Sequence, residues 1–406
     1  MKIFPLSKAG VSVCLGAALS LAAYAERMKP ELQPAIRRGD KSAIQALLEA
    51  GASVKARDAG GNTPLLQAAL YADAQAVRLI LAQGADPNAA NDEGATPLMR
   101  AAPDYAKVRL LLRHGANPRP QSKLGNTALI LAVRSYGSAR VVKLLLDHGA
   151  DVNATNHYGA NALMAASAAG DLAAVRLLLD HGADINANPA SEGFDLFFGG
   201  MRGPLHWAAF CGDSKLAAFL LSRGAHVNQP SASGSPLVQA AWSGQAGVAK
   251  LLLDHGAIVD QRDLLAGYTA LHWAASADHG RADLVKLLLA RGADPNAEGG
   301  QSVDAFLGVP QTPLLLAHKR GRTPIVEALL AANAKEALVE KKKSPPPGSG
   351  RVAERLDASS VRTALENILP RLRKTAGDSR AAFFKHATKQ DCTSCHQQYL
   401  PQGVVD

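Results

Sequence analysis

The sequence has very little cysteine for its length. Only four of its 406 residues are cysteines, and Cys14 lies inside an apolar stretch near the start of the chain. If that stretch is removed, Cys211, Cys392 and Cys395 are left, which is too few for the paired framework of a small secreted domain. The composition therefore excludes the disulfide-rich class.

Recognisable catalytic patterns are also missing. The chain has no His-Glu-x-x-His sequence, no Ser-His-Asp arrangement and no phosphate-binding loop. Its carboxylates are spread over expected turn positions, such as Asp86, Asp151, Asp184 and Asp294. The central part of the chain therefore offers no catalytic constellation, and we expect the protein not to be an enzyme.

Long apolar runs are absent after the first 25 residues. Residues 1–25 contain Lys2 and Lys8, then an uncharged apolar run over residues 9–23, and they end on Ala-Tyr-Ala. This pattern predicts a secretory signal peptide cleaved after Ala25, because the run is shorter than the roughly 20 residues that a membrane-spanning helix needs. We therefore expect a periplasmic or otherwise exported protein, with no transmembrane segment in the mature chain.

The charge is unevenly distributed along the chain. The formal net charge is +9, and removal of Lys2 and Lys8 leaves +7. Residues 335–406 contain 13 basic and 8 acidic residues, so +5 of the excess is C-terminal. A basic tail is typical of proteins that bind nucleic acid, an anionic surface or an acidic protein. Export makes nucleic acid the poorest of these three, and we expect no nucleic acid partner.

What the chain does contain is a repeat. Between residues 30 and 334 a Gly-Ala pair recurs at intervals of 33, 31, 34, 33, 42, 32, 36 and 41 residues, with Asn333-Ala334 standing in at the end. The glycines of the pairs are Gly51, Gly84, Gly115, Gly149, Gly182, Gly224, Gly256 and Gly292. A period near 33 is typical of a solenoid, in which each unit packs against its neighbours.

Each repeat contains the signals of two helices. Threonine stands where a helix cap belongs, and proline often follows at the first helical position, where a missing N–H costs nothing. The capping threonines are Thr63, Thr96, Thr127, Thr269 and Thr312. A Val-x-x-Leu-Leu stripe then predicts a second helix with one buried face, and the glycine of the Gly-Ala pair accepts the left-handed turn that ends it.

These units resemble the ankyrin repeat, whose Thr-Pro-Leu-His-x-Ala-Ala motif is similar to GPLHWAA at residues 203–209 and TALHWAA at residues 269–275. About eight units are recognisable, with an incomplete capping unit over residues 30–54. The resemblance implies an all-α solenoid of L-shaped helix pairs, with projecting turns (the fingers) and a concave protein-binding face. A protein partner is therefore expected on the concave face or on the fingers.

Histidines recur at equivalent positions of the units. His206 and His272 occupy the histidine of the motif, where the resemblance implies that the imidazole ties neighbouring turns together. Others precede the glycine that ends a helix, where a partial positive charge suits the helix terminus. These are His114, His148, His181 and His255. We expect structural roles for all of them, and we expect Cys211, alone in a repeat helix, to be buried.

Two intervals are longer than the others because extra residues enter at 188–202 and 298–310. Both segments contain Asp-x-Phe-x-Gly, at residues 195–199 and 304–308, and both should lengthen a finger on the same side of the solenoid, three units apart. Their aromatic residues are candidates for anchoring a partner. These residues are Phe197, Phe198 and Phe306. In the alternative, the phenylalanines fold back over the adjacent repeats, and the sequence does not decide between the two.

The repeat ends at Asn333 and the composition then changes. Residues 335–350 are typical of a helix end followed by a flexible linker rich in lysine, proline and glycine. Residues 351–406 have helical periodicity and predict a small helical segment. The solenoid is therefore joined flexibly to a small C-terminal segment.

The C-terminal segment contains Cys-Thr-Ser-Cys-His at residues 392–396. Two thiols at this spacing can add to the two vinyl groups of a haem while the adjacent histidine ligates the iron. In an exported chain this order predicts one covalent haem c, with Cys392 and Cys395 as thioether residues and His396 as the proximal ligand. A disulfide and half of a zinc site are the alternatives, but a disulfide does not explain His396 and zinc needs further ligands.

The segment also resembles short c-type haem modules of bacterial exported proteins, through Phe-Phe-Lys at residues 383–385 and the stretch 392–401. Unlike an ordinary small cytochrome, it has no methionine after His396. The second axial ligand then comes from elsewhere, with His386 the nearest candidate, or the sixth position is open. An open position would permit small-ligand binding or peroxidase-like chemistry.

Together these patterns predict an exported ankyrin solenoid that binds a protein partner and carries one haem c on a flexible arm, for electron transfer to a redox partner or for redox sensing. Two alternatives stay open. One is a haem enzyme or gas sensor with an open iron site. The other is a pure protein-interaction module whose terminal cysteines form a disulfide.

Overall fold

The computed structural model describes the chain between Leu32 and Lys335, with gaps. The described residues are 32–188, 203–231, 233–263, 266–276, 282–299, 311–318 and 323–335. The chain divides into two units, Met1–Glu336 and Ala337–Asp406, and every described residue belongs to the first. The signal peptide at 1–25 and the haem segment at 351–406 lie outside the described residues, as does the linker after Lys335, so these stay predictions.

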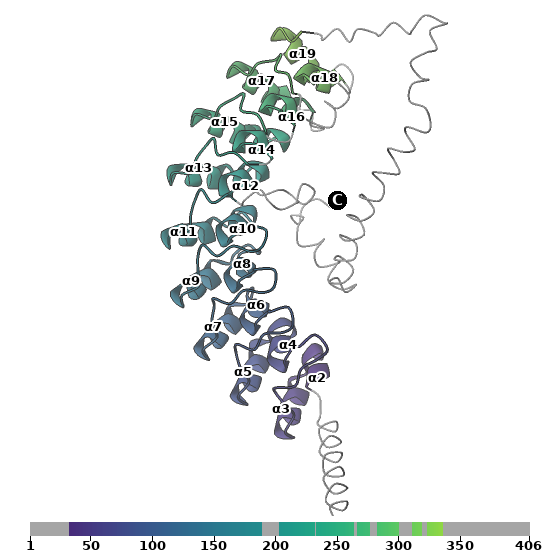
Figure 1. The fold of residues 1–406 in the computed structure, drawn as a ribbon, viewed down its shortest axis with the longest axis vertical. Helices are drawn as coiled ribbons and strands as arrows, with labels where there is room; N and C mark the ends of the chain where they lie inside the picture. Colours follow the sequence, from purple (N-terminus) through teal and green to yellow (C-terminus); the bar gives the residue numbers. More distant parts are fainter. Residues whose placement is uncertain are drawn as a thin grey trace, which may run out of the picture. The chain divides into compact units, whose positions relative to one another are not determined.

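The described part of the first unit is a stack of helix pairs arranged in two columns (Figure 1). The first column contains α2 (Gln33–Arg38), α4 (Pro64–Tyr71), α6 (Pro97–Ala101), α8 (Ala128–Ala132), α10 (Ala162–Ala168), α12 (Pro204–Cys211), α14 (Pro236–Trp242), α16 (Ala270–Ser276) and α18 (Pro313–His318). The second column contains α3 (Lys41–Glu49), α5 (Ala74–Ala82), α7 (Tyr105–Arg113), α9 (Ala139–Asp147), α11 (Leu172–Asp180), α13 (Ser214–Ser222), α15 (Ala246–Asp254), α17 (Ala282–Ala290) and α19 (Pro324–Ala331). Each helix packs on its partner, neighbouring helices of the first column pack on one another, and the first column lies on the inner side of this unit's curve. The described residues contain no β-strand, as predicted for an all-α solenoid.

The first helices begin where the sequence predicts a cap. The Thr63 hydroxyl accepts a hydrogen bond from the Leu66 N–H at 3.3 Å, and three other predicted threonines cap in the same way. These are Thr96, Thr127 and Thr312. Thr269 differs, because its hydroxyl lies 2.9 Å from Nδ1 of His272. In this unit a histidine of the same helix takes the place of the backbone N–H as the hydroxyl's partner.

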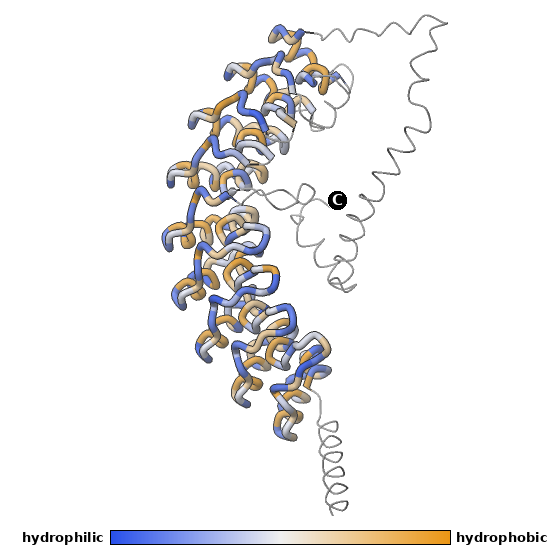
Figure 2. The backbone as a smooth tube through the Cα atoms, in the orientation of Figure 1, coloured by the Kyte–Doolittle hydropathy of each residue, from blue (hydrophilic) through white to orange (hydrophobic). Residues whose placement is uncertain are grey.

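Small and branched apolar residues form one continuous core between the columns. Paired alanines such as Ala68 and Ala69 are buried in the first helices, and their small size allows neighbouring first helices to approach closely. The second helices bury one face, for example Val77 and Ile80 of α5. Hydrophobic residues therefore concentrate in the helices, whereas the turns between them are mainly hydrophilic (Figure 2).

Asparagines after five of the second helices bond one unit to the next. Asn153 donates from Nδ2 to the Gly182 carbonyl at 3.1 Å and accepts at Oδ1 from the Asp184 N–H at 3.0 Å. The same pair of bonds recurs at Asn88, Asn186, Asn228 and Asn296. One asparagine amide thus bonds both a carbonyl that has no partner within its own helix and an N–H of the following turn. Because these bonds recur along the stack, they fix the spacing of the units.

The structural roles predicted for the histidines are confirmed. His206 and His272 each place Nε2 3.0 Å from a carbonyl oxygen of a later turn, that of Gln229 and Gln311 respectively. The four histidines before the helix-ending glycines each place Nδ1 between 2.7 and 2.9 Å from the carbonyl oxygen four residues earlier. The burial expected for Cys211 is wrong, because it is the last residue of α12 and its side chain lies at the exposed end of that helix.

Candidate functional site

The predicted site residues all lie outside the described part of the chain. They are Cys392, Cys395, His396 and His386 for the haem and Phe197, Phe198 and Phe306 for the partner. Their roles therefore stay predictions. The structure does place the residues at which the two insertions begin and end, and these positions lead to an aromatic surface that the sequence analysis did not identify.

Five aromatic side chains are in contact across three consecutive first helices. Trp207 and Phe210 belong to α12, Trp242 ends α14, Trp273 belongs to α16, and Tyr268 lies just before α16. The ring centroids are 6.1 Å apart from Trp207 to Phe210, 6.2 Å from Phe210 to Trp242 and 5.2 Å from Trp242 to Trp273. Tyr268 continues the series, 5.5 Å from Trp273. These five residues are termed the aromatic stripe.

The aromatic stripe reaches the surface of the stack. Trp242 is 41% exposed, Trp207, Phe210 and Trp273 are half-buried, and Tyr268 is buried. The stripe contains all three tryptophans of the chain. Tryptophan and tyrosine are enriched where proteins meet partners, because a large rigid ring buries much apolar area while losing little conformational entropy. The described residues therefore offer a candidate docking surface on the first-helix column.

Buried side chains hold one end of the stripe in place. The Trp273 indole N–H donates to Oδ2 of Asp263 at 2.7 Å, which fixes the orientation of that ring. The Tyr268 ring stacks on the His272 imidazole, with centroids 4.9 Å apart and an interplanar angle of 7°. Because these partners are buried, this end of the stripe is prearranged before any ligand binds.

The insertion at 298–310 begins and ends against the stripe. Gly299 and Gln311 form an antiparallel bridge with backbone hydrogen bonds of 2.9 and 3.1 Å, and the carbonyl of Gln311 receives the bond from His272. Gly299 lies so close to the Tyr268 ring that a Cβ added there would overlap it. Only glycine fits at this contact, so the base of the insertion is fixed to the stripe by packing as well as by hydrogen bonds.

The insertion at 188–202 also ends beside the stripe. At its start, Asn188 donates from Nδ2 to the Pro230 carbonyl at 2.8 Å. At its end, buried Gly203 is the N-cap residue of α12, the helix that contains Trp207. The insertion at 188–202 therefore lies next to α12, at one end of the stripe, and the insertion at 298–310 begins next to α16, at the other end.

The sequence contained a signal for this surface that composition and motif spacing did not reveal. Trp207 and Trp273 follow the histidine in two Leu-His-Trp-Ala-Ala segments, and Trp242 follows the alanine pair of the unit between them. Equivalent positions in consecutive repeats lie side by side in a solenoid. The contact of Phe210 with Trp242, which both follow the alanine pair of their units, could therefore have been predicted. That of Trp242 with Trp273 could not, because these two residues occupy different positions of the repeat.

His272 lies beneath the stripe and is fully buried. Its Nδ1 accepts from the Thr269 N–H at 3.1 Å and its Nε2 lies 3.0 Å from the Gln311 carbonyl oxygen, an arrangement that suits a neutral imidazole with its proton on Nε2. The pKa of His272 is lowered from 6.5 to about 4, mainly because the imidazole is buried; the hydrogen bond to the Gln311 carbonyl opposes this shift and the charge of Arg262 adds to it. His272 is therefore neutral in the folded protein near neutral pH.

We expect acid to destabilise this part of the solenoid through His272. The unfolded chain binds the proton with a pKa near 6.5 and the folded chain with a pKa of about 4, so stability is full above pH 6.5 and falls as the pH decreases toward 4. At about pH 4.5 the loss is about 2–3 kcal/mol of unfolding free energy. Urea unfolding at about pH 7 and about pH 4.5 measures it, with His272→Gln as the comparison. An equal loss in that variant would show that other groups cause the pH dependence.

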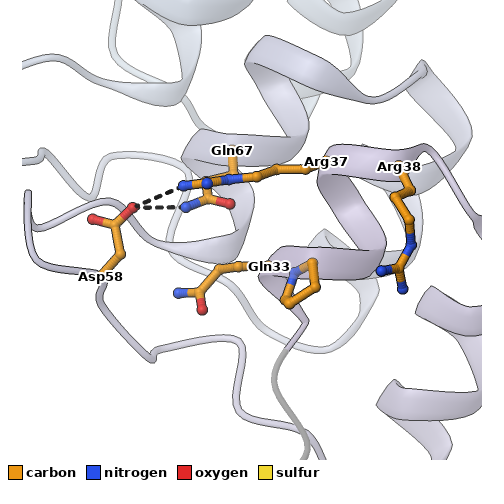
Figure 3. Close-up of a pocket in the computed structure, with 6 residues that line it drawn as sticks. Gln33, Arg37, Arg38, Asp58 and Gln67 are labelled. Carbon is orange, nitrogen blue, oxygen red and sulfur yellow. Dashed lines mark hydrogen bonds and ion pairs between the residues drawn. The ribbon is translucent and has the colours of Figure 1, made fainter. Parts of the chain in front are cut away.

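A polar cavity of about 380 Å³ lies at the first end of the stack (Figure 3). It is lined by Gln33, Pro34, Arg37, Arg38, Asp58 and Gln67. Asp58 accepts from Nε2 of Gln67 at 2.7 Å and lies 3.9 Å from Nη2 of Arg37. Burial by itself raises the pKa of Asp58, but hydrogen bonds from Asn62, Gly60 and Gln67 outweigh it and hold the pKa below its usual value. The carboxylate is thus engaged within the cavity wall, and the aromatic stripe is the stronger candidate site.

Within residues 32–335, gaps excepted, no group of three or more His, Cys, Asp or Glu side chains is placed to hold a metal ion. None of the helices described above is long and apolar enough to cross a membrane.

Comparison with protein families gives one consistent match. A model of ankyrin repeats in three copies matches residues 32–122, 103–189 and 205–299, which together make up more than half of the chain. A second model, of ankyrin repeats in many copies, matches residues 163–221.

Individual relatives cover parts of the chain. The E3 ubiquitin-protein ligase XBAT33 of Arabidopsis thaliana is 36% identical over 94 residues, which are 23% of this chain and 18% of that protein. The chain thus spans less than a fifth of that relative's length. Among solved structures, the human ASB11 ankyrin repeat domain is 26% identical, with 59% of this chain and 98% of that domain covered and a TM-score of 0.48.

Proposed function

Because this chain belongs to the ankyrin-repeat family, whose fold is a scaffold for protein–protein interaction, we propose that it is an exported scaffold that docks a protein partner on its aromatic stripe and carries one covalent haem c. The haem would serve electron transfer or redox sensing. The observation that carries the docking assignment is the continuous contact of five aromatic rings on the first-helix column, with Trp242 41% exposed.

The two insertions support the same docking surface. The insertion at 298–310 begins and ends beside the stripe and the insertion at 188–202 ends beside it, and both contain phenylalanines that are candidates for partner binding. The insertions at Gly203 and Gly299 would make the contact area with a partner larger than that of the repeats alone. Hot spots of interfaces are typically aromatic anchors surrounded by such additional contacts.

The haem assignment rests on the donor set at the C-terminus. Cys392 and Cys395 would hold the haem through thioether bonds and His396 would ligate the iron, with His386 the candidate second ligand. Bound there, the haem would supply one-electron oxidation and reduction. The predicted linker at residues 335–350 would keep this segment at high effective concentration near whatever protein the scaffold docks.

Export of the full chain from a host that matures c-type haem tests this function. We expect a c-type pyridine-haemochrome spectrum and an intact mass that corresponds to one haem on a chain beginning at Glu26. The double variant Cys392→Ala, Cys395→Ala should lose all covalent haem, because both thioether bonds are removed. The matched control Cys211→Ala should keep it.

Absence of haem from the wild-type chain would contradict the proposal. Residues 392–396 would then be a thiol pair and the chain a binding solenoid without a cofactor. An intact mass that includes residues 1–25 would contradict the export part separately.

A further inference from the structure

The two halves of the solenoid carry opposite net charges. Residues 32–149 contain 15 basic and 9 acidic residues, which gives +6, whereas residues 150–334 contain 12 basic and 16 acidic residues, which gives −4. The first half includes the four helix pairs from α2 to α9. Such an asymmetry steers charged partners, and an acidic partner is drawn to these four pairs.

The first helices of these four pairs contain three arginines and no acidic residue. Their sequences are QPAIRR, PLLQAALY, PLMRA and ALILA, in α2, α4, α6 and α8. Because α4, α6 and α8 each pack on a second helix and on both neighbours in their column, their exposed side chains face the inner side of this unit's curve (Figure 1). The inner face of these pairs is therefore basic.

The arginines gather around the polar cavity of about 380 Å³. Arg37 and Arg38 of α2 line it together with Gln67 of α4 (Figure 3). Gln67 and Arg100 are each the fourth residue after the capping threonine of their unit, and equivalent positions of neighbouring repeats lie side by side. Arg100 of α6 therefore lies next to a cavity that is large enough for a small ligand or a side chain of a partner.

The carboxylates of the protein leave most of this positive charge uncompensated. Asp58 lines the cavity and lies 3.9 Å from Nη2 of Arg37. Within the described residues, Arg38 and Arg100 form no ion pair. A guanidinium group binds a carboxylate strongly when two parallel hydrogen bonds form, and it offers five N–H donors for this. Arg38 and Arg100 thus suit a ligand with two separate carboxylates.

Two other kinds of anionic partner fit this face less well. A lipid surface is flat on the scale of four helix pairs, whereas this face is on the inner side of a curve (Figure 1). A nucleic acid strand is a long polyanion, and along the same column it would meet the second half of the solenoid with its net charge of −4. A short acidic segment of a protein remains on the first four pairs and avoids both difficulties.

We propose that this arginine face, defined by Arg37, Arg38 and Arg100, binds a short acidic segment of a protein, with one carboxylate in the cavity against Arg38 and a second against Arg100. Tyr71 is 58% exposed and, like Arg38, stands two residues before the aspartate that caps the second helix of its unit. It adds an aromatic contact beside the arginines, a combination that is typical of interface hot spots. This inference goes beyond docking on the aromatic stripe and depends on neither the stripe nor the haem.

A synthetic peptide of alternating glutamate and serine is the probe. About ten extended residues span about 30 Å, which covers the first helices of three or four units spaced about 8–10 Å apart. The fluorescently labelled peptide is titrated with the full-length haem-loaded protein and followed by fluorescence anisotropy. We expect saturable binding that weakens as salt is raised from about 0.15 M to about 0.5 M, because salt screens exposed charges. A peptide of alternating glutamine and serine should not bind.

Two double variants of equal charge locate the binding. Arg38→Gln with Arg100→Gln should weaken the affinity for the acidic peptide at least about tenfold, because both carboxylate contacts are lost. The matched control is Arg78→Gln with Arg113→Gln, which removes two exposed arginines from the second helices α5 and α7. It should leave the affinity within about twofold of the wild type, because only long-range attraction changes. Circular dichroism of both double variants should match the wild type.

Several results would overturn the proposal. Absence of binding, or an affinity unchanged by Arg38→Gln with Arg100→Gln, would refute the site. Equal losses in the two double variants would reduce the binding to general attraction by net charge. Binding of anionic vesicles or single-stranded DNA in place of the peptide, lost in the same double variant, would reassign the face to lipid or nucleic acid.

The aromatic stripe and the haem have separate readouts. Trp242→Ala should leave the affinity for the acidic peptide unchanged, and a loss in that variant would place the peptide on the stripe and overturn the proposal. Haem content is read from the absorption spectrum of the same sample. Failure of the peptide titration is therefore distinguishable from failure of the proposed function.

Discussion

Asp171→Ala will lower the free energy of unfolding by about 4 kcal/mol, a large part of what a stable domain has. Asp171 is 2% exposed and bonds two units together. Its Oδ1 accepts from the Ala174 N–H at 3.1 Å and caps α11. Its Oδ2 accepts from the N–H of Ser138 at 2.8 Å and from the Ser138 hydroxyl at 3.0 Å, at the start of α9. Alanine would remove the cap and leave two buried donors of Ser138 without an acceptor.

Asp40→Ala is the matched control for this prediction. Asp40 caps α3 through the same bond, from the Ala43 N–H to Oδ1 at 3.0 Å, but it is exposed at the first end of the stack. Its loss should cost about 1 kcal/mol, the ordinary value of a helix cap. Urea unfolding followed by circular dichroism measures both. Equal costs for the two variants would show that the bonds from Asp171 to Ser138 contribute nothing.

Gly125→Ala is expected to cost about 3 kcal/mol, from two separate causes. Gly125 has φ +76°, a left-handed conformation that costs a residue with a Cβ about 1 kcal/mol or more. Its added Cβ would also lie 2.8 Å from the Asn156 Cα and from the His157 N. These are backbone atoms of the next finger, so the clash is relieved only if neighbouring units separate and the bond from the His157 N–H to the Leu124 carbonyl at 3.0 Å is lost.

Gly115→Ala separates the two causes. Gly115 has φ +83°, which is the same kind of backbone strain, but a Cβ there meets no atom within 4 Å. It should therefore cost only about 1 kcal/mol. Thermal or urea unfolding of the two variants gives the difference. A cost at Gly125 no greater than that at Gly115 would mean that the fingers move apart freely.

These two predictions concern contacts between units, and the repeat pattern does not predict such contacts. The pattern gave the helices, their threonine caps and the glycine turns, since each signal lies within a few residues of the structure that it specifies. Thr269 shows the first departure, because its hydroxyl is partnered by His272. Cys211 shows another, because its position at the end of α12 decides its exposure.

The two candidate sites, the haem motif and the aromatic stripe, also differ in whether the sequence alone reveals them. The haem motif at residues 392–396 could be recognised from sequence because its two thiols and its imidazole are adjacent in the chain. The aromatic stripe could not be found by motif or composition, because Trp207, Trp242 and Trp273 are 35 and 31 residues apart. No single tryptophan has a neighbour in the chain that marks it as part of a site.

The sequence by itself determined a helical solenoid with a period near 33, its helix ends, its two insertions and the thiol-imidazole motif of its tail. Local hydrogen bonds and backbone preferences are sufficient for these features. Only the tertiary structure decided that three tryptophans of successive units form one aromatic surface, that both insertions enter beside it, and that Asp171 and Gly125 are contacts between units. The physical reason is that stacking brings side chains of neighbouring repeats within a few ångströms of one another, and the chemistry of such a surface belongs to no single repeat.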